Sequence, residues 1–439
     1  MKIVIIGDGK VGYKLAKQLS SEKYDIILID NNEEKLRKSI ERMDVFCVAG
    51  EGGSVEVQQR ADVPHADLVI ACTSTDECNM LSCLIARRLG ARHTIARVRN
   101  PIYYKQIDFL KKDLHLSMVV NPELIVAGDI TRLLLFPDAS KVETFVKGRV
   151  ELVEFPIHCG KLEGLSLSEL YARFQVQVLV CAVESGETVL IPDGDYILKA
   201  GDKLHIAASH QNMEQFFKKI ALRKEKIKNA MICGGGRVAY YLASQLCNLG
   251  MNVKIIERNR ERCEELCELL PQATIINGDA TEHDLLIEEG IEKTDAFIAL
   301  TGMDEENIIM SLFASKQSVS KVIVKINEDR RAMMIDELGY LSSCPFLQTT
   351  LHLLRFSQCS ANVETMYQLL DGRVEALEFI IKSENAYTGV PLKDLNLKVN
   401  NIIACIARGR KIIIPNGDDS IQVGDSVVII TMTKQIRDL

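Results

Sequence analysis

The chain has 439 residues, of which 47% are hydrophobic and 26% charged, values typical of a globular protein. No apolar run reaches the roughly 18 residues of a membrane-spanning helix, and we expect neither membrane insertion nor a secretory signal. The net charge of −7 argues against nucleic-acid binding, and thirteen scattered cysteines favour reduced thiols over a disulfide framework.

Strand and helix patterns alternate in the first part of the chain. Apolar runs predict strands at 3–6, 25–29, 45–49, 67–72 and 94–98. Amphipathic spacing predicts helices at 11–20, 33–40 and 75–89, the second of them capped by Asn32. Buried strands that alternate with helices imply a parallel, doubly wound sheet of the Rossmann-like α/β class. The segment 122–135 is apolar at helical spacing and is expected to cross to another domain or subunit.

Near residue 143 the pattern changes to short strands and turns, which end in Ile-Pro-Asp-Gly-Asp at 191–195 and Gly-Asp at 201–202. After a basic linker at 223–228 the whole order returns, ending in Ile-Pro-Asn-Gly-Asp at 414–418 and Gly-Asp at 424–425. A repeat of this length predicts two kinds of domain, each used twice. The expected Rossmann-like domains are 1–140 and 229–362, and the expected small α+β domains are 141–222 and 363–439.

The repeat is sharpest at a glycine loop after the first strand of each half. Gly7 permits a tight strand-to-helix turn, Gly9 lets a pyrophosphate approach the backbone, and Gly12 allows close helix–strand contact. The first helical amides would then face an anion, with Asp8 and Val11 completing the loop. The second copy, 227 residues later, reads Gly234, Gly236 and Ala239. The counter-charges expected at one shared loop position are Lys10 and Arg237.

An acidic residue ends the second strand of each copy. Asp30 lies 23 residues after Gly7, and Glu257 lies 23 residues after Gly234. A carboxylate here accepts hydrogen bonds from adenosine ribose hydroxyls. It also repels the 2′-phosphate of NADP, by roughly 4 kcal/mol per unit charge pair at about 4 Å and an effective dielectric near 20. We therefore predict NAD(H) or another adenine nucleotide, although Arg258 weakens this inference for the second copy.

Further polar residues follow the later strands, at the carboxyl ends where parallel sheets bind ligands. In the first copy the candidates are Gly50, Thr73, Ser74, Asp76, Glu77 and Arg97. In the second copy they are Gly278, Asp279, Thr301, Asp304 and Lys325. An alternative reading makes Thr75 or Asp76 only the N-cap of the following helix.

The twin glycine loops, the Thr-x-x-Asp-Glu-x-Asn loops at 73–79 and 301–307, and the paired Gly-Asp endings resemble the TrkA family. This family comprises peripheral subunits of bacterial Trk potassium uptake systems, and the resemblance covers essentially the whole chain. It implies tandem RCK (KTN) and TrkA-C domains in a cytoplasmic gating ring, a homo-oligomeric dimer or tetramer. It further implies attachment, at the inner face of the membrane, to a potassium-translocating subunit, with NAD(H), ATP or ADP as regulators.

The chain departs from the family pattern at two places, and both set the two copies apart. Gly53 stands where the second copy has Thr281, and the Asn121-Pro122-Glu123 entry to the expected crossover helix has no clear equivalent before Thr350. One site could therefore bind NAD and the other ATP, ADP or AMP, or nothing. The crossover segments 122–135 and 350–356 are candidates for swapped contacts in a ring.

Two alternative functions are an NAD-dependent dehydrogenase and an ion or metabolite sensor. An NAD-dependent dehydrogenase needs a proton-relay group, but the candidates His158, His205 and His210 have no histidine counterparts in the second half. An ion or metabolite sensor could use the Asp193, Asp195 and Asp202 oxygens for a hard cation, although turn chemistry explains these residues equally well. We expect neither catalytic residues nor a resident metal.

Overall fold

The computed structural model describes the chain except for residues 22, 137, 147, 158–161, 221–225, 328–340, 344–362, 370–372, 396–399 and 433–439, and except for the side chains of 341–343 and 363–369. The chain forms two compact units, one built from residues 1–131 and 228–357 and the other from 132–227 and 358–439. Among the described residues, no helix combines the length and the hydropathy needed to cross a bilayer.

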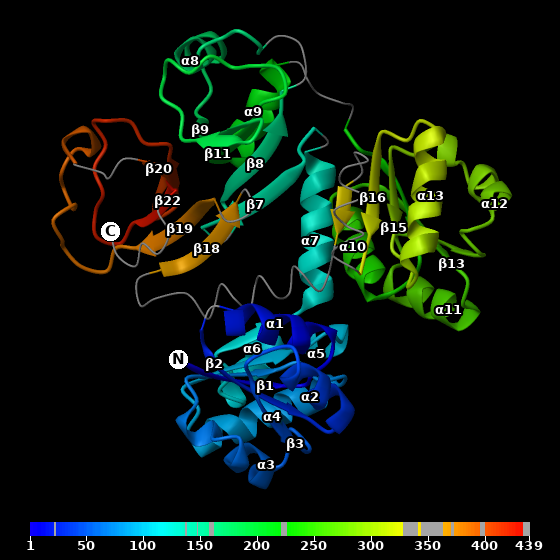
Figure 1. Ribbon diagram of the computed structural model, residues 1–439. Helices are drawn as coiled ribbons and strands as arrows, with labels where there is room; N and C mark the ends of the chain where they lie inside the picture. Colours follow the sequence, from blue (N-terminus) through cyan, green and yellow to red (C-terminus); the bar gives the residue numbers. More distant parts are fainter. Residues whose placement is uncertain are drawn as a thin grey trace. The chain divides into compact units, whose positions relative to one another are not determined.

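The first unit begins with a parallel sheet in the order β3-β2-β1-β4-β5-β6. Its strands are β1 (Lys2–Ile6), β2 (Asp25–Asp30), β3 (Phe46–Ala49), β4 (Leu68–Ala71), β5 (His93–Arg97) and β6 (Met118–Val120). Its helices are α1 (Lys10–Ser21), α2 (Glu33–Ile40), α3 (Val55–Arg60), α4 (Asp76–Leu89), α5 (Pro101–Lys105) and α6 (Ile107–Asp113). Figure 1 shows these elements in blue to cyan. The strand order reverses between β1 and β4, which is where such sheets open a ligand crevice.

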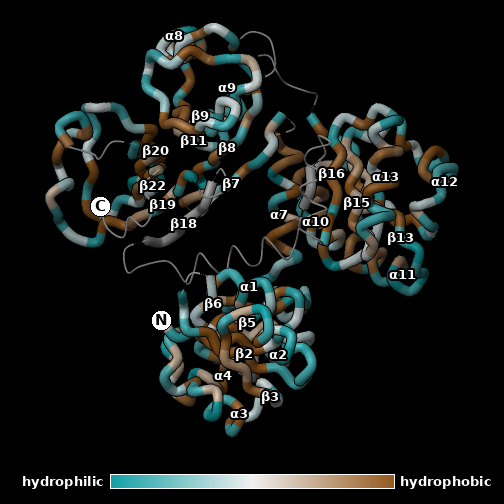
Figure 2. The backbone as a smooth tube through the Cα atoms, viewed as in Figure 1, coloured by the Kyte–Doolittle hydropathy of each residue, from teal (hydrophilic) through white to brown (hydrophobic). Residues whose placement is uncertain are grey.

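Alternating side chains of β1 supply two separate cores. Ile3 and Ile5 pack with Leu15 and Leu19 of α1, whereas Val4 and Ile6 pack on the other face with Cys83 and Ala86 of α4. All of these side chains are essentially inaccessible to solvent. The strands are predominantly brown in Figure 2 for this reason. Each face of the sheet is thus covered by helices, as a buried parallel sheet requires.

The same unit contains a second parallel sheet with the matching order β14-β13-β12-β15-β16-β17. Its strands are β12 (Asn229–Cys233), β13 (Asn252–Glu257), β14 (Thr274–Asn277), β15 (Ala296–Ala299), β16 (Lys321–Lys325) and β17 (Leu341–Ser343). Its helices are α10 (Arg237–Asn248), α11 (Arg260–Leu269), α12 (His283–Glu288) and α13 (Asp304–Lys316). Helix α7 (Pro122–Leu135) follows β6 of the first sheet.

The second unit contains two five-stranded antiparallel sheets of the same topology. The first sheet has β7 (Lys141–Phe145), β8 (Val150–Pro156), β9 (Leu179–Ser185), β10 (Thr188–Leu190) and β11 (Lys203–Ser209), with helices α8 (Leu167–Phe174) and α9 (His210–Lys219). The second has β18 (Val363–Leu369), β19 (Val374–Ile380), β20 (Asn401–Arg408), β21 (Lys411–Ile413) and β22 (Ser426–Thr431). One cluster of buried side chains, including Phe145, Leu152, Ala376 and Val428, is shared by both sheets.

The observed architecture confirms the predicted fold class of two Rossmann-like sheets, each followed by a small α+β domain. Asn32 caps α2 as predicted, because its side chain accepts a hydrogen bond from the Lys35 amide. Helices α3, α5 and α6 and strand β6 were absent from the predicted elements, since each is only 3 to 7 residues long. The expected crossover segment 350–356 lies outside the described residues.

Candidate functional site

The glycine loop between β1 and α1 leaves open space at one glycine only. Gly7 has a φ of +106°, and a Cβ there would lie 2.9 Å from the Thr73 nitrogen. A Cβ on Gly12 would lie 1.9 Å from the carbonyl oxygen of Gly7, so the packing of the domain itself requires both glycines. A Cβ on Gly9 would meet nothing within 4 Å. The loop therefore keeps an accessible backbone at Gly9, the position at which a phosphate would approach.

Asp30 closes this loop from the end of β2. Its Oδ2 accepts a hydrogen bond from the Asp8 backbone nitrogen at 2.7 Å, and its Oδ1 accepts one from the Asn32 nitrogen at 2.9 Å. A carboxylate has about four acceptor positions, so Asp30 retains capacity for ribose hydroxyls.

The side chain of Asp8 is buried and accepts a 2.6 Å hydrogen bond from Ser39 Oγ. Burial raises the pKa of this carboxyl, and the charge of Asp30 raises it further. Asp8 thus contributes its backbone to the loop, while its side chain contacts α2.

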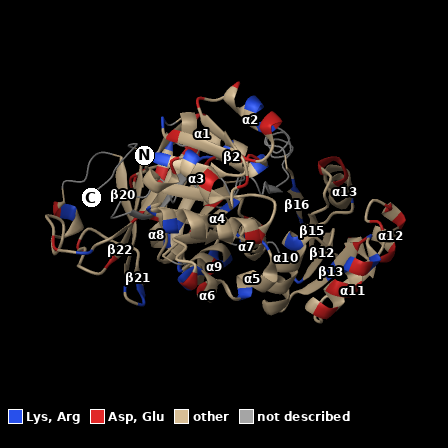
Figure 3. Ribbon diagram, turned by 90° about the horizontal axis from the view of Figure 1, so that it is seen from below, with Lys and Arg blue, Asp and Glu red and all other residues tan. Residues whose placement is uncertain are grey.

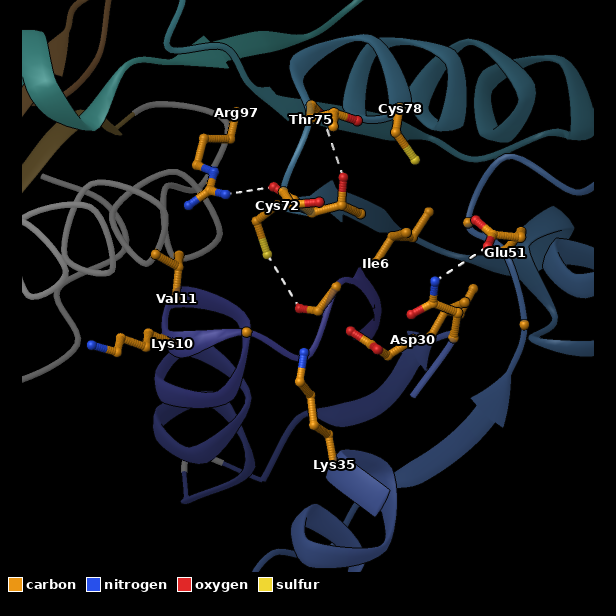
Figure 4. Close-up of a pocket in the computed structure, with 18 of the residues that line it drawn as sticks. Ile6, Lys10, Val11, Asp30, Lys35, Glu51, Cys72, Thr75, Cys78 and Arg97 are labelled. Carbon is orange, nitrogen blue, oxygen red and sulfur yellow. Dashed lines mark hydrogen bonds between the residues drawn. The ribbon is translucent and has the colours of Figure 1, made fainter. Parts of the chain in front are cut away.

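A cavity of about 500 Å³ opens above the loop, within the usual size range of small-ligand pockets. Nine of the predicted residues line it, namely Gly7, Gly9, Lys10, Val11, Asp30, Gly50, Thr73, Ser74 and Arg97. The other lining residues are Ile6, Ile29, Asn31, Lys35, Glu51, Gly52, Cys72, Thr75, Cys78 and Arg99. Figure 4 shows that the Lys35 ammonium group points toward the loop, whereas the side chain of Lys10 extends away from Asp30.

The cavity has an acidic end and a basic end. Asp30 lies near Glu51, whose Oε1 accepts a hydrogen bond from Asn31 Nδ2 at 3.2 Å. At the other end the Arg97 guanidinium donates to the Thr73 carbonyl, and the Arg99 guanidinium donates to the Ser74 carbonyl. Carboxylates at one end and guanidiniums at the other are chemically complementary to the ribose hydroxyls and the phosphates of a nucleotide.

Arg97 and Arg99 keep spare donor capacity. The Nε atoms of both residues are buried and have no hydrogen-bond partner among the described residues. Burial lowers the pKa of Arg97, but a guanidinium stays protonated throughout the physiological range. The sequence indicated Arg97 but not Arg99 or Lys35. The sequence signal for Arg99 was its place two residues after the end of β5, and that for Lys35 was its place in the first turn of α2.

Asp76 and Glu77 do not line the cavity. Asp76 is buried, and its Oδ2 accepts hydrogen bonds from the backbone nitrogens of Arg99 at 2.8 Å and Asn100 at 2.7 Å. Glu77 accepts a hydrogen bond from the Tyr103 hydroxyl at 2.7 Å. Thr75 precedes α4 but makes no side-chain capping hydrogen bond. Asp76 therefore holds the loop after β5 against the start of α4 and acts on the cavity through Arg99.

Asn79 was not among the predicted residues, although it ends the Thr-x-x-Asp-Glu-x-Asn loop. It is fully buried, and its Oδ1 accepts hydrogen bonds from both the nitrogen and the Oγ1 of Thr73 at 2.7 Å. Its Nδ2 donates to the Arg97 carbonyl at 2.9 Å. Asn79 thereby joins the ends of β4 and β5, which carry the basic end of the cavity.

The second copy repeats this framework. Gly234 has a φ of +99°, and a Cβ on Gly236 would meet nothing within 4 Å. Glu257 accepts hydrogen bonds from the Gly235 nitrogen at 2.6 Å and the Asn259 nitrogen at 2.7 Å. The counterpart contacts at β15 and β16 are Thr301 to Asn307, Asn307 to Lys325 and Asn327 to Asp304. Ala239 is fully buried at the third glycine position.

Three features distinguish the second site from the first. Gly235 replaces Asp8, and a Cβ there would lie 2.7 Å from Leu266. Arg262 occupies the place of Lys35 and donates from Nε to the Gly235 carbonyl at 2.7 Å. Helix α11 carries this arginine among both acidic and basic residues (Figure 3). Asp279 is engaged by Thr281, because its Oδ1 accepts from the Thr281 nitrogen at 2.9 Å and from Oγ1 at 2.8 Å.

The basic residue that ends β16 is also placed differently from Arg97. Lys325 donates from Nζ to the Leu300 carbonyl at 3.2 Å, and burial lowers the pKa of its ammonium group. A single ammonium held by a carbonyl offers fewer directed donors than two guanidiniums. A Cβ on Gly278 would lie 2.5 Å from the Leu285 Cδ2 atom, so a larger residue there would require that side chain to move.

Glu123, at the start of α7, lies in the field of cations from both copies. Burial raises the pKa of its carboxyl, while Arg99, Arg97 and Arg237 oppose that rise. Its Oε2 has no hydrogen-bond partner among the described residues. Arg237 is therefore close enough to interact electrostatically with the beginning of the crossover helix.

The described residues behind the two alternative functions belong to the first α+β domain, and the Nε2 atom of His205 has no hydrogen-bond partner among the described residues. His205 is buried in β11, and His210 lies 2.8 Å from Glu151 Oε1. His158 lies outside the described residues. Asp202 accepts hydrogen bonds from the Tyr196 hydroxyl and the Lys199 nitrogen, as turn chemistry predicts. No cluster of three potential metal-ligating side chains occurs in the part of the chain that the structure describes.

Comparisons with known proteins identify both kinds of domain. The sequence matches the TrkA-N domain family at residues 3–122 and 230–342 and the TrkA-C domain family at 152–221 and 376–439. It is 32% identical to the Trk system potassium uptake protein TrkA of Halomonas elongata, over 100% of this chain and 98% of that protein. A TrkA homolog of Methanosarcina mazei is 31% identical, over 98% of this chain and 97% of the relative.

Solved structures show the same fold. The GsuK channel bound to NAD has a TM-score of 0.65 at 18% identity, with 98% of this chain and 76% of that chain covered. The GsuK RCK domain has the same TM-score and identity, with 92% of its own length covered. At these identities the likeness concerns the arrangement of the domains.

Proposed function

Since the chain belongs to the TrkA family of Trk-system potassium uptake proteins, we propose that it is a nucleotide-binding regulatory subunit. In this proposal it controls a membrane protein that translocates potassium, and it does so from the cytoplasm at the inner face of the membrane. The observation that carries the proposal is the first cavity, where an open glycine backbone lies between carboxylates and guanidiniums.

The proposed ligand of the first site is NAD(H). Asp30 and Glu51 would accept hydrogen bonds from the adenosine ribose, and the amides at Gly9–Val11 would face the pyrophosphate. Arg97 and Arg99 would neutralise the remaining phosphate charge. In the second site Arg262 of α11 donates to the glycine loop, and a single lysine ends β16. We propose ATP, ADP or AMP as the ligand of this site.

Regulation would proceed through a closed homo-oligomeric ring. Two Rossmann-like domains in each chain would bring four together in a dimer and eight in a tetramer. A nucleotide shifts such a ring only through its different affinities for two arrangements, typically worth about 1–3 kcal/mol. The crossover helix α7 is the proposed contact between domains, since it leaves the first sheet directly after β6.

A catalytic role is not part of this proposal. Dehydrogenases place a proton-relay group, commonly histidine or tyrosine, beside the nicotinamide. The described lining of the first cavity contains neither residue type, and its lysines lie at the phosphate loop and in the first turn of α2. This composition favours binding without chemistry.

Calorimetric titration of the full-length protein with NADH, NAD, ATP and ADP tests the nucleotide sites. We expect saturable binding that Asp30→Ala weakens at one site and Glu257→Ala weakens at the other. A stoichiometry above one per chain would support occupation of both sites. Absence of binding by all four nucleotides would overturn the proposed function.

The proposed partner is tested by potassium flux. Vesicles that contain the potassium-translocating subunit of the same Trk system would be measured with and without this protein. We expect the protein to change the flux in a nucleotide-dependent way, and Asp30→Ala to reduce the nucleotide dependence. A flux that is identical with and without the protein would argue against a gating role.

A further inference from the structure

Helix α10 of the second Rossmann-like domain touches the backbone of a residue that lines the first cavity. The hydroxyl of Tyr241 donates a hydrogen bond to the Arg99 carbonyl oxygen at 3.1 Å. The same hydroxyl accepts one from Asn121 Nδ2 at 3.0 Å. Tyr241 is only 8% exposed, and burial raises the pKa of its hydroxyl to about 12. The hydroxyl therefore keeps the proton that it donates to Arg99 throughout the physiological range.

Arg99 is held from two sides. Its backbone nitrogen donates to Asp76 Oδ2 of its own domain at 2.8 Å, and its carbonyl accepts from Tyr241 of the other domain. Its guanidinium donates to the Ser74 carbonyl, and its Nε lies 3.5 Å from Asp76 Oδ1. The direction in which this guanidinium enters the cavity thus depends on a backbone that both domains position.

Two contacts hold α10 against the crossover helix. Asn121 caps α7 by accepting from the Leu124 nitrogen at 3.0 Å while it donates to Tyr241. One turn further along α10, Gln245 Oε1 accepts from Thr131 Oγ1 at 2.8 Å. Figure 1 shows α7 and α10 side by side. Tyr241 therefore occupies a defined position relative to Arg99.

Helix α10 also carries the glycine loop of the second site. It begins at Arg237, directly after Gly236, whose backbone is open to a ligand. Tyr241 lies four residues later, a rise of roughly 6 Å along the helix axis. The helix whose N-terminus would face a second-site ligand therefore also carries the hydroxyl that contacts the Arg99 backbone.

We propose that Tyr241 is a positioning residue for the first nucleotide site, which the second Rossmann-like domain thereby completes. The inference rests on the proposed nucleotide-binding function. Tyr241 touches no ligand itself and acts through the Arg99 backbone.

The test uses Tyr241→Phe in the full-length protein, which removes the hydroxyl and keeps the ring. Tyr240→Phe is the matched control, because Tyr240 is the neighbouring buried tyrosine, and its ring packs on Tyr241 with 5.2 Å between centroids. Each substitution is combined with Glu257→Ala to report the first site alone, and with Asp30→Ala to report the second. NADH and ATP are titrated calorimetrically into every variant.

We expect Tyr241→Phe to weaken binding at the first site about five- to tenfold, since it leaves the Arg99 carbonyl and the Asn121 amide without a buried partner. Binding at the second site and the effect of Tyr240→Phe should stay within about twofold. A lower melting temperature with unchanged first-site affinity would overturn the proposal, and so would equal losses at both sites. Absence of nucleotide binding by the Glu257→Ala protein and by the unmodified protein would instead overturn the proposed function, and this inference with it.

Discussion

The carboxylate of Asp30 accepts a hydrogen bond from the backbone amide of Asp8 across 2.7 Å, which ties the end of β2 to the glycine loop. Glu257 makes the same contact with the Gly235 amide at 2.6 Å in the second copy. One acidic residue thus shapes each loop, and its remaining lone pairs would accept hydrogen bonds from a ribose in the proposed sites. A charge fixed in this way discriminates between ligands because it cannot move away from an added phosphate.

The first prediction concerns NADPH. Asp30 should oppose its 2′-phosphate, and we expect NADPH to bind at least tenfold more weakly than NADH, which corresponds to about 1.4 kcal/mol or more. Asp30→Asn should narrow the ratio because it removes the charge and keeps the shape. Competition titrations of both nucleotides against the Glu257→Ala protein give the two affinities. Equal binding of NADH and NADPH would contradict the assigned role of Asp30.

The second prediction separates two glycines of one loop. Gly12→Ala should destabilise the protein by about 2–3 kcal/mol, because the new Cβ would lie 1.9 Å from the Gly7 carbonyl oxygen. Gly9→Ala should leave the melting temperature nearly unchanged, since a Cβ there meets no protein atom within 4 Å, yet it should abolish first-site nucleotide binding.

Thermal melting and calorimetric titration of both variants check this pair, and Gly236→Ala is the equivalent change in the second site. Unimpaired binding by Gly9→Ala would mean that no phosphate approaches this backbone.

The third prediction concerns the basic end of the first cavity. Arg97→Gln should weaken ATP and NADH binding by about tenfold and leave adenosine binding nearly unchanged, because the guanidinium serves phosphates. Lys17→Gln on the exposed face of α1 is a control that removes the same charge away from the cavity. Titrations at two salt concentrations should show a smaller salt dependence for Arg97→Gln alone. Equal losses for ATP and adenosine would indicate a structural role for Arg97.

The fourth prediction concerns pH and the first α+β domain. His205 is buried in β11, and burial lowers its pKa to about 4, with Glu154 on β8 opposing the shift and Lys141 on β7 and Lys203 on β11 adding to it. The neutral imidazole is therefore the folded form, and protonation below about pH 6.5 favours unfolding. Stability should be complete above that pH and should fall by about 2 kcal/mol between pH 7.5 and 5.

His205→Val should remove this fall, since valine occupies the corresponding place at Val428 in the second α+β domain. His210 works in the opposite direction, because its contact with Glu151 raises its pKa and stabilises the domain at low pH. Urea unfolding of both proteins at pH 7.5 and 5 measures the difference. An unchanged pH dependence in His205→Val would assign the loss to other groups.

Short-range sequence patterns predicted much of the secondary structure of the Rossmann-like domains. The apolar runs and the Asn32 cap placed β1, β2 and α2 to within one residue, because burial and capping act between near neighbours. The short helices α5 and α6 were not predicted, because fewer than two helical turns are too short to show a helical period of apolar residues. Strand β6 has three residues and depends on its partner β5 for its existence.

The candidate site was predicted less completely. Gly9 and Asp30 could be proposed from the sequence because one helix and one strand fix the spacing between them. Arg99 and Asn79 could not, because each matters through a contact with a residue from another strand end. Asp76 shows the converse, since it looks like a ligand-facing acid in the sequence but binds the backbone at Arg99.

The duplicated domain order, the two glycine loops and the acid that follows each can be recognised in the sequence alone. Repeats and fixed spacings are local features, so recognising them requires no information about distant contacts. Only the tertiary structure showed that Arg262 contacts the second glycine loop, and that Tyr241 reaches Arg99 across 142 residues of sequence. Such contacts arise when helices pack and buried polar groups find partners. Which residues make these contacts depends on how the domains are arranged in space, and the spacing of residues along the sequence does not give that arrangement.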